Sequence, residues 1–165
     1  MKILIISHGY APALNARAFR WTALAEHWGA QGHEVDVVTV RTSASHQDSA
    51  PGVRVHRVGF YLDKLGVYAR HSAHDSATIA KGQASAPARK IGRLAIRAAK
   101  KVYDLTWKKL YWPDYALPWI PFAATAARRL VARNRPDLII SVSLPFSSHV
   151  AALLARKKGI PWIVD

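Results

Sequence analysis

The chain has 165 residues, half of them hydrophobic, and its 24 Lys and Arg against 10 Asp and Glu give a formal charge of +14. This length fits one domain with a real core, the apolar content excludes a disordered chain, and the absence of cysteine excludes disulfides, zinc–thiolate sites and a cysteine nucleophile. A polyanionic partner is expected, although charge alone leaves nucleic acid, anionic lipid and a phosphorylated substrate open.

The N-terminal stretch predicts the first βα unit of an open parallel sheet. Residues 3–6 form an apolar strand, a turn-rich loop follows, and residues 17–32 have a helical pattern. In such sheets ligands bind beyond the carboxyl ends of the strands, where the strand order reverses. A helix start capped by Asn15 favours an anion there. The sequence lacks the glycine patterns of dinucleotide and P-loop sites. We therefore expect this loop to bind the ligand, with candidate contacts at His8, Gly9, Tyr10 and Asn15.

The next elements continue the same architecture. Residues 32–40 contain a near-continuous apolar strand, as expected where both faces of a parallel sheet are covered. Residues 42–52 are polar and predict a surface loop, and residues 53–58 alternate Val with Arg and His, as an exposed edge strand does. The predicted fold is α/β: a Rossmann-like, doubly wound, mainly parallel sheet with helices on both faces.

The middle of the chain has a different pattern. Residues 61–87 lack periodicity and predict a mobile excursion. Within it, His71, His74 and Asp75 have a spacing that could hold a metal ion, which we attribute to chance. Residues 88–112 predict a basic amphipathic helix ending in aromatic residues. This helix either packs on the core with a solvated basic face or attaches to an anionic membrane, which its aromatic end favours. The candidate membrane-binding residues are Lys90, Arg93, Arg97, Lys101, Trp107, Lys108 and Trp112.

The last third predicts a second strand–loop–helix unit. Three prolines in residues 111–121 argue against regular helix there, and Asp114 within this rigid segment serves either a ligand or a turn. Residues 122–134 predict a helix, residues 137–144 an apolar strand, residues 150–158 another helix, and residues 160–165 a fifth strand. We expect Ser147 or Ser148 to cap the helix at 150–158, which places hydroxyls and His149 at a strand's carboxyl end.

Two segments together resemble a known family. The opening KILIISHGYAPALNARAFRWTALAEHWGAQGHEVDVVTV and the later block PDLIISVSLPFSSHVAALLARKKGIPWIVD resemble the N-terminal, acceptor-side domain of GT-B glycosyltransferases of family 4, in the branch that builds bacterial surface polysaccharides. The resemblance implies a retaining transfer of sugar from a nucleotide-sugar, which is a substrate rather than a cofactor, to a lipid-linked or glycan acceptor. The reaction takes place between two Rossmann-like domains, usually without a metal.

The resemblance also implies an incomplete chain. Residues 1–165 correspond to a single N-terminal domain, and the family continues after the position of Asp165 with an Arg-Asp pair and a second domain. We therefore expect a fragment that is inactive alone. The sequence has neither an apolar run of the roughly 18 residues that a membrane-spanning helix needs nor a signal peptide, so the expected location is cytoplasmic, peripheral on the inner face of the cell membrane.

The resemblance further implies roles for particular residues. The first loop and helix start correspond to acceptor or diphosphate contacts, and Arg suits phosphate because its planar fork donates two hydrogen bonds at once. His149 lies where the family brings this domain to the reacting sugar, as a catalytic or donor-orienting group, unless it merely caps or packs. The implied substrate-binding residues are His8, Gly9, Tyr10, Asn15, Arg17, Arg20, Asp114, Ser143, Ser147, Ser148 and Asp165.

Simpler interpretations of these residues stay open. Arg17 and Arg20 also fit a solvated helix face, and Asp165 also fits a structural role. A basic, Rossmann-like interaction module without catalysis is the alternative function. A nucleic-acid-associated protein explained by charge alone is a further one, but the chain has no motif that reads nucleic acid. In the glycosyltransferase interpretation, residues 8–15 and 143–149 face each other across the point where the strand order reverses.

Overall fold

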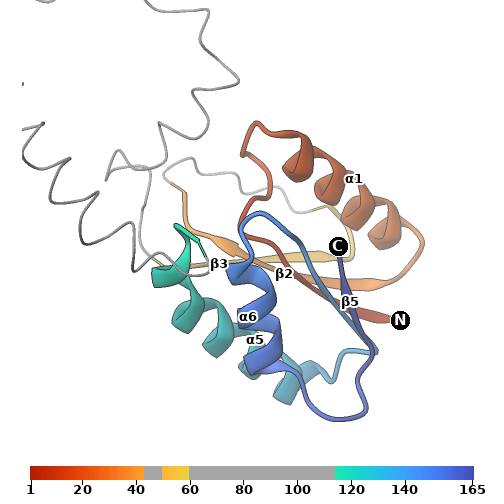
Figure 1. Ribbon diagram of the computed structural model, residues 1–165. Coiled ribbons are helices and arrows are strands. Elements are labelled where there is room, and N and C mark those ends of the chain that lie inside the picture. The colour runs from red at the N-terminus through yellow and green to blue at the C-terminus, as the bar shows by residue number, and fades with distance from the viewer. Residues whose placement is uncertain (43–49, 60–113) are drawn as a thin grey trace, which may run out of the picture.

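Five strands form one sheet in the computed structural model of the chain, which describes residues 1–42, 50–59 and 114–165 (Figure 1). The strands are β1 (Lys2–Ile6), β2 (Glu34–Val40), β3 (Val53–Val58), β4 (Leu138–Ser141) and β5 (Trp162–Val164). Their spatial order is β3-β2-β1-β4-β5, and every pair is parallel. The strand order therefore reverses between β1 and β4, and β3 is an edge strand as the sequence predicts.

Helices cover both faces of this sheet. Helix α1 (Ala16–Ala30) lies on one face, and α5 (Ile120–Asn134) and α6 (Ser147–Ala155) lie on the other (Figure 1). The pleat of β1 divides its side chains between two cores: Ile5 packs in the cluster that includes Trp21 of α1, whereas Ile6 packs with Ala127 of α5 and the helix beside it. The Rossmann-like α/β fold expected from the sequence is confirmed.

The ends of α1 follow from local sequence. The Asn15 side chain accepts a hydrogen bond from the main-chain N–H of Ala18 at 2.8 Å, so the predicted N-cap is confirmed. At the other end, the main-chain N–H of His33 donates to the carbonyl of Trp28 at 3.0 Å, across Gly32 with its φ of +84°. Glycine adopts this left-handed conformation without the steric cost that a Cβ brings.

Two predicted helix starts were wrong. Helix α5 begins at Ile120, directly after the short 3₁₀ turn η3 (Leu117–Trp119), so Pro121 lies inside the helix rather than before it. Proline is tolerated there because the first-turn N–H groups have no partner within the helix. Helix α6 begins at Ser147, three residues before the predicted start, and no side chain at its N-cap position, Phe146, caps it.

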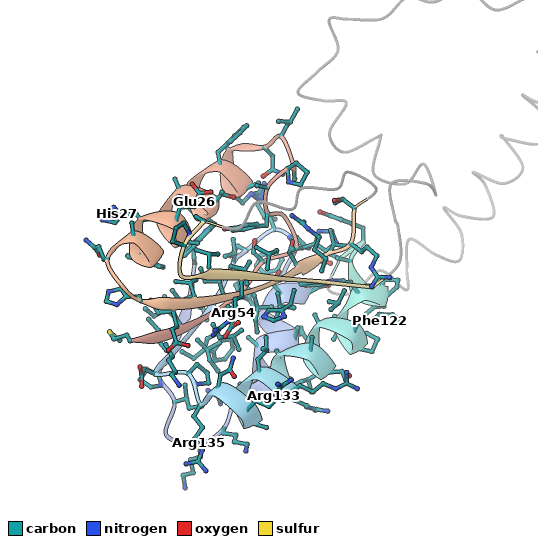
Figure 2. All side chains as sticks on the ribbon, turned by 180° about the vertical axis from the view of Figure 1, so that it is seen from behind. Glu26, His27, Arg54, Phe122, Arg133 and Arg135 are labelled. Carbon is teal, nitrogen blue, oxygen red and sulfur yellow. The ribbon has the colours of Figure 1, made fainter. Side chains whose placement is uncertain are left out.

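A buried carboxylate joins three elements on the α5 face. Asp36 of β2 accepts hydrogen bonds from the Arg54 guanidinium at 2.9 and 3.1 Å, from His56 Nε2 at 2.8 Å and from Asn134 Nδ2 at 2.7 Å. The Arg54 side chain, which extends from β3 (Figure 2), and Asn134 at the end of α5 thus bind the same carboxylate. Burial alone would raise the pKa of Asp36, but these hydrogen bonds and the Arg54 charge outweigh it and hold the pKa well below its usual range.

Several sequence predictions lie outside the described residues. These are the excursion at 61–87, the basic helix at 88–112 with its membrane-binding residues, and the spacing of His71, His74 and Asp75. Among the helices that the structure describes, none has the length and apolar character needed to span a membrane.

Candidate functional site

The loops after β1 and β4 meet at the carboxyl edge of the sheet, where the strand order reverses. Beyond the ends of these strands, the main-chain N–H of Val142 still donates to the carbonyl of Ile6 at 3.0 Å. Arg17, in the first turn of α1, donates from Nη1 to the carbonyl of Leu144 at 3.0 Å. The two loops therefore face each other, as expected from the sequence. Leu144 adopts a φ of +52°, a conformation that is strained for a residue with a Cβ.

Asp165 lies at one side of this edge, next to α1. Its carboxylate forms an ion pair with Arg20 and accepts a hydrogen bond from the indole N–H of Trp21 at 3.1 Å. The Arg20 guanidinium lies 5.7 Å from the centroid of the Trp21 ring, within the range of a cation–π interaction. The first two turns of α1 are thus tied to the end of β5 through one carboxylate.

His149 lies between two serines of the β4 segment. Its Nδ1 is 2.7 Å from Ser141 Oγ, and its Nε2 is 3.0 Å from Ser143 Oγ. Ser143 in turn donates its hydroxyl to the main-chain oxygen of Asp165. Burial lowers the pKa of His149, with the carboxylates of Asp165 and Asp114 acting in the opposite direction. Since the ordinary value for histidine is about 6.5, the imidazole is mainly neutral near neutral pH.

The N-terminus of α6 already holds an anion of the protein itself. Asp114 accepts the main-chain N–H of Ser147 at 2.9 Å and the Ser147 hydroxyl at 2.6 Å. It also accepts the N–H of Ala116 at 2.9 Å, which is the turn role that the sequence left open. The prediction that Ser147 or Ser148 caps the helix is wrong because both lie inside its first turn and Asp114 supplies the cap. Ser148 is fully buried, and its hydroxyl has no hydrogen-bond partner within the described part of the chain.

The side chains of His8 and Tyr10 lie in the core rather than at the site. His8 is 1% exposed, with its ring centroid 5.8 Å from that of Tyr115 and 5.0 Å from that of Trp119, and burial lowers its pKa to about 4, against a smaller opposite effect of Asp114. Tyr10 is 4% exposed in the core on the α1 face, and burial raises its pKa to about 12. Gly9 lies between them, where a Cβ would stand 3.4 Å from the Asn15 amide nitrogen.

The structure therefore divides the sequence-predicted residues. It brings together a set at the carboxyl edge: Arg17, Arg20, Asp114, Ser143, Ser147, His149 and Asp165. Asn15 caps α1 next to this set, whereas His8, Tyr10 and Ser148 are buried. Their binding roles stay predictions.

Sequence reasoning missed three residues that complete the edge. Trp21 holds Asp165, Ser141 contacts His149, and Trp162 donates from its indole N–H to Ser141 Oγ at 2.8 Å. The sequence does contain an indication for Ser141, because a hydroxyl residue is unusual at the end of the apolar run of β4. It contains no such indication for Trp21 and Trp162, because a tryptophan alone predicts only a place in the core.

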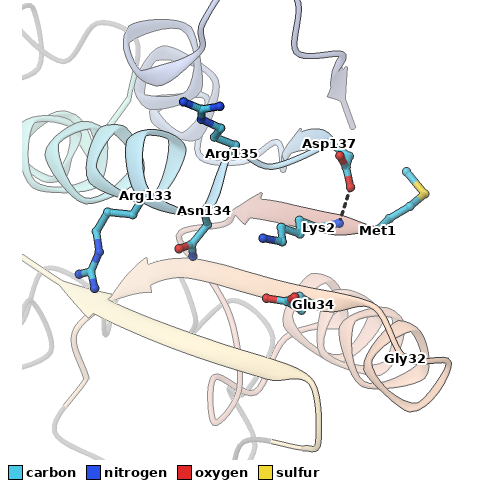
Figure 3. Close-up of a pocket in the computed structure, with 8 residues that line it drawn as sticks. All are labelled: Met1, Lys2, Gly32, Glu34, Arg133, Asn134, Arg135 and Asp137. Carbon is cyan, nitrogen blue, oxygen red and sulfur yellow. Dashed lines mark hydrogen bonds between the residues drawn. The ribbon is translucent and has the colours of Figure 1, made fainter.

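A hollow of about 470 Å³ lies at the opposite edge of the sheet (Figure 3). It is lined by Met1, Lys2, Gly32, Glu34, Arg133, Asn134, Arg135 and Asp137. These residues gather at the amino ends of β1, β2 and β4, whereas ligands of open parallel sheets bind at the carboxyl ends. Side chains of both charges line it, and Asp137 is engaged by the main-chain N–H of Lys2 at 2.7 Å. The carboxyl edge is the better candidate site.

The carboxyl edge combines two cations, a neutral imidazole and serine hydroxyls. Such a set suits recognition of a phosphate and hydrogen bonding to a sugar. Both carboxylates near His149 are engaged by other groups of the chain, Asp114 by Ser147 and Asp165 by Arg20. Within residues 1–42, 50–59 and 114–165, no group of three His, Cys, Asp or Glu side chains could hold a metal ion.

Comparison with known proteins identifies a family. A family model described as "Glycosyl transferase 4-like domain" matches residues 18–165, which include most of α1 and every later element of the carboxyl edge. A search of curated proteins found no match.

Proposed function

The chain belongs to the glycosyltransferase 4-like family, and on this premise we propose that it is the acceptor-binding, N-terminal domain of a retaining GT-B glycosyltransferase. The enzyme transfers a sugar from a nucleotide-sugar to a lipid-linked or glycan acceptor in the synthesis of bacterial surface polysaccharide. The observation that supports this most is the position of Arg17 and Arg20 at the strand reversal, across from His149.

The two arginines suit an acceptor phosphate. Both lie near the N-terminus of α1, whose first turn contains no acidic residue, so the helix dipole adds to their positive charge. Arg17 donates to one carbonyl, that of Leu144, which leaves donors of its guanidinium fork for a ligand. Arg20 and Trp21 both bind the Asp165 carboxylate. A phosphate that binds Arg20 therefore competes with this carboxylate, which the Trp21 indole can continue to hold.

The chemistry that we propose does not need paired carboxylates. A glycosidase places two carboxyl groups on either side of the reacting bond, whereas Asp114 and Asp165 are each engaged by neighbouring groups. In our proposal the departing diphosphate assists attack by the acceptor hydroxyl on an oxocarbenium-like sugar. His149 touches the sugar as the donor-orienting group, and the second GT-B domain supplies most of the nucleotide-sugar contacts.

Binding of a short polyprenyl diphosphate tests the acceptor role. We would titrate the 165-residue chain with farnesyl diphosphate by calorimetry. We expect Arg17→Ala and Arg20→Ala each to weaken binding about tenfold, a loss of about 1.4 kcal/mol, because each removes a charge-assisted contact. Arg129→Ala removes the same charge from the exposed surface of α5 and should leave binding unchanged.

Three results would contradict the acceptor role. Equal affinities of all three variants for farnesyl diphosphate would mean that its binding depends on net charge alone. Binding of farnesol as tightly as the diphosphate would mean that the arginines do not read the phosphate. If neither compound binds and the variants fold normally, a non-catalytic interaction module becomes the better interpretation.

A further inference from the structure

The imidazole of His149 has a neighbour at each ring nitrogen, and the directions of the surrounding hydrogen bonds are fixed. On the Nδ1 side, Ser141 Oγ lies 2.7 Å from the ring and 2.8 Å from the indole nitrogen of Trp162. An indole N–H only donates, so the Ser141 oxygen is an acceptor in that bond. The Ser141 hydroxyl proton is therefore free to point to Nδ1, and it does so when the imidazole proton is on Nε2 and Nδ1 is the acceptor.

The hydrogen bonds on the Nε2 side of the ring run in the same direction. The Ser143 hydroxyl donates to the main-chain oxygen of Asp165, so its oxygen has lone pairs left to accept. The 3.0 Å contact between Ser143 Oγ and His149 Nε2 is then a bond donated by Nε2–H. The chain of bonds runs one way, from the Trp162 indole through Ser141 and the imidazole to Ser143.

We propose that Ser141 and Trp162 are positioning residues that hold the neutral His149 ring with its proton on Nε2 and its Nδ1 occupied. Ser141 is fully buried, so water does not readily replace its hydroxyl. Trp162 is held in turn by Arg156, whose guanidinium lies 5.1 Å from the centroid of the indole. The pair joins β4 and β5 to the imidazole of His149 on α6, and it fixes the plane of the ring as well as its tautomer.

The arrangement gives His149 a defined role toward an oxygen atom in the crevice. With Nδ1 engaged by Ser141, the ring presents an N–H donor at Nε2, next to Ser143, which is partly exposed. A sugar hydroxyl or a phosphate oxygen that displaces the Ser143 contact receives that proton in a hydrogen bond. This role of His149 toward substrate rests on the proposed function, whereas the tautomer itself does not.

Nuclear magnetic resonance of ring-labelled histidine tests the proposal on the 165-residue chain. Two-bond ¹H–¹⁵N spectra near neutral pH distinguish the two tautomers, and His149→Gln assigns the signals by their loss. We expect the wild type to show the Nε2–H pattern. Ser141→Ala should lose the single pattern and give a mixture of tautomers, because Nδ1 no longer has its donor. Thr125→Ala removes an exposed hydroxyl on α5 and should leave the pattern unchanged.

A second variant keeps the test decisive if Ser141→Ala does not fold. Trp162→Phe keeps an aromatic ring beside Arg156 but frees the Ser141 hydroxyl to rotate, so it should also mix the tautomers, to a smaller extent. An Nδ1–H pattern in the wild type overturns the proposal, as does a Trp162→Phe or Ser141→Ala spectrum identical to that of Thr125→Ala. Failure of farnesyl diphosphate binding with the expected tautomer response would leave the positioning pair intact and overturn the proposed function alone.

Discussion

At the level of single residues, the burial of His8 links its protonation to folding. In the unfolded chain the ring gains a proton near its ordinary pKa of 6.5, whereas in the folded protein burial keeps it neutral down to about 4. Between these values the unfolded state binds more protons, so the free energy of unfolding falls as the pH is lowered from 6.5 toward 4. The loss is on the order of 3 kcal/mol.

Replacing His8 by an aromatic residue without a titrating group should remove that loss. We expect His8→Phe to keep more of its stability than the wild type as the pH falls from 6.5 to about 4, because no ring remains to be protonated on unfolding. Urea unfolding at both ends of this range measures it. His27→Gln, which replaces an exposed histidine of α1, serves as the control and should follow the wild type. An equal loss in His8→Phe and the wild type would assign the acid sensitivity to other groups.

At the level of elements, Asp36 joins β2, β3 and α5 at one point. Its side chain is 8% exposed and accepts from Arg54, His56 and Asn134. A buried carboxylate without these donors would be destabilising, whereas Arg54 and His56 are partly exposed and can turn to water. Position 36 therefore tolerates change much less than the exposed acidic position two residues earlier in the same strand.

The comparison of Asp36→Asn with Glu34→Gln tests this. Both variants remove a negative charge that faces Arg54, but Glu34 is 51% exposed. We expect Asp36→Asn to lose roughly 2–3 kcal/mol of unfolding free energy, and Glu34→Gln less than about 1 kcal/mol. Chemical denaturation near neutral pH measures both. Equal losses would mean that the four hydrogen bonds to Asp36 contribute no more than a surface ion pair.

The same variants differ in their acid response. The folded-state pKa of Asp36 is depressed, so its contribution is present above the unfolded value of about 3.8 and is lost as the pH falls through the folded value. The advantage of the wild type over Asp36→Asn should therefore shrink below about pH 4.

At the level of the whole molecule, the charge of +14 and the proposed lipid-linked acceptor both favour an anionic membrane surface. The candidate surface is the basic helix predicted at residues 88–112, which lies outside the described residues. The described part of the chain has exposed basic residues of its own, including Arg129 and Arg133 of α5 and Arg135 just after it. Figure 2 labels Arg133 and Arg135. The three arginines provide a charge-matched comparison.

Flotation with anionic vesicles distinguishes binding through a specific surface from binding through net charge. We expect the triple change Lys90→Ala, Arg93→Ala and Arg97→Ala to reduce the floated fraction strongly, because each basic residue near anionic lipid contributes about 1 kcal/mol. The triple change Arg129→Ala, Arg133→Ala and Arg135→Ala removes the same charge and should reduce it little. Equal reductions would reject the predicted helix as the membrane surface, and a wild-type chain that does not float with anionic vesicles would reject the membrane location.

The elements that the sequence predicted well are those whose signals are local. The apolar runs of β1 and β2 and the Asn15 cap depend on neighbouring residues, and the structure confirms them. The strand order follows from the general rule that open parallel sheets reverse at a central strand. These features were sufficient to place residues 8–15 opposite residues 143–149.

The features that the sequence did not predict depend on distant partners. Asp114 caps α6 from 33 residues away, so Ser147 lies inside the helix although its residue type suits a cap. Asp165 reaches Trp21 across 144 residues, and the Ser141 hydroxyl reaches the Trp162 indole across 21. No periodicity in the sequence encodes such pairs, because each arises only once the sheet brings its strands together.

The pairing of β1 with β4 also has a consequence for biosynthesis. Of the five strands described, β1 is the first to leave the ribosome, yet one of its two neighbours in the sheet starts at Leu138. At roughly 5–20 residues per second, one edge of this apolar strand waits on the order of ten seconds for its partner. The interval gives chaperones time to bind the nascent chain, and it makes the last third of the chain the part whose synthesis completes the centre of the sheet.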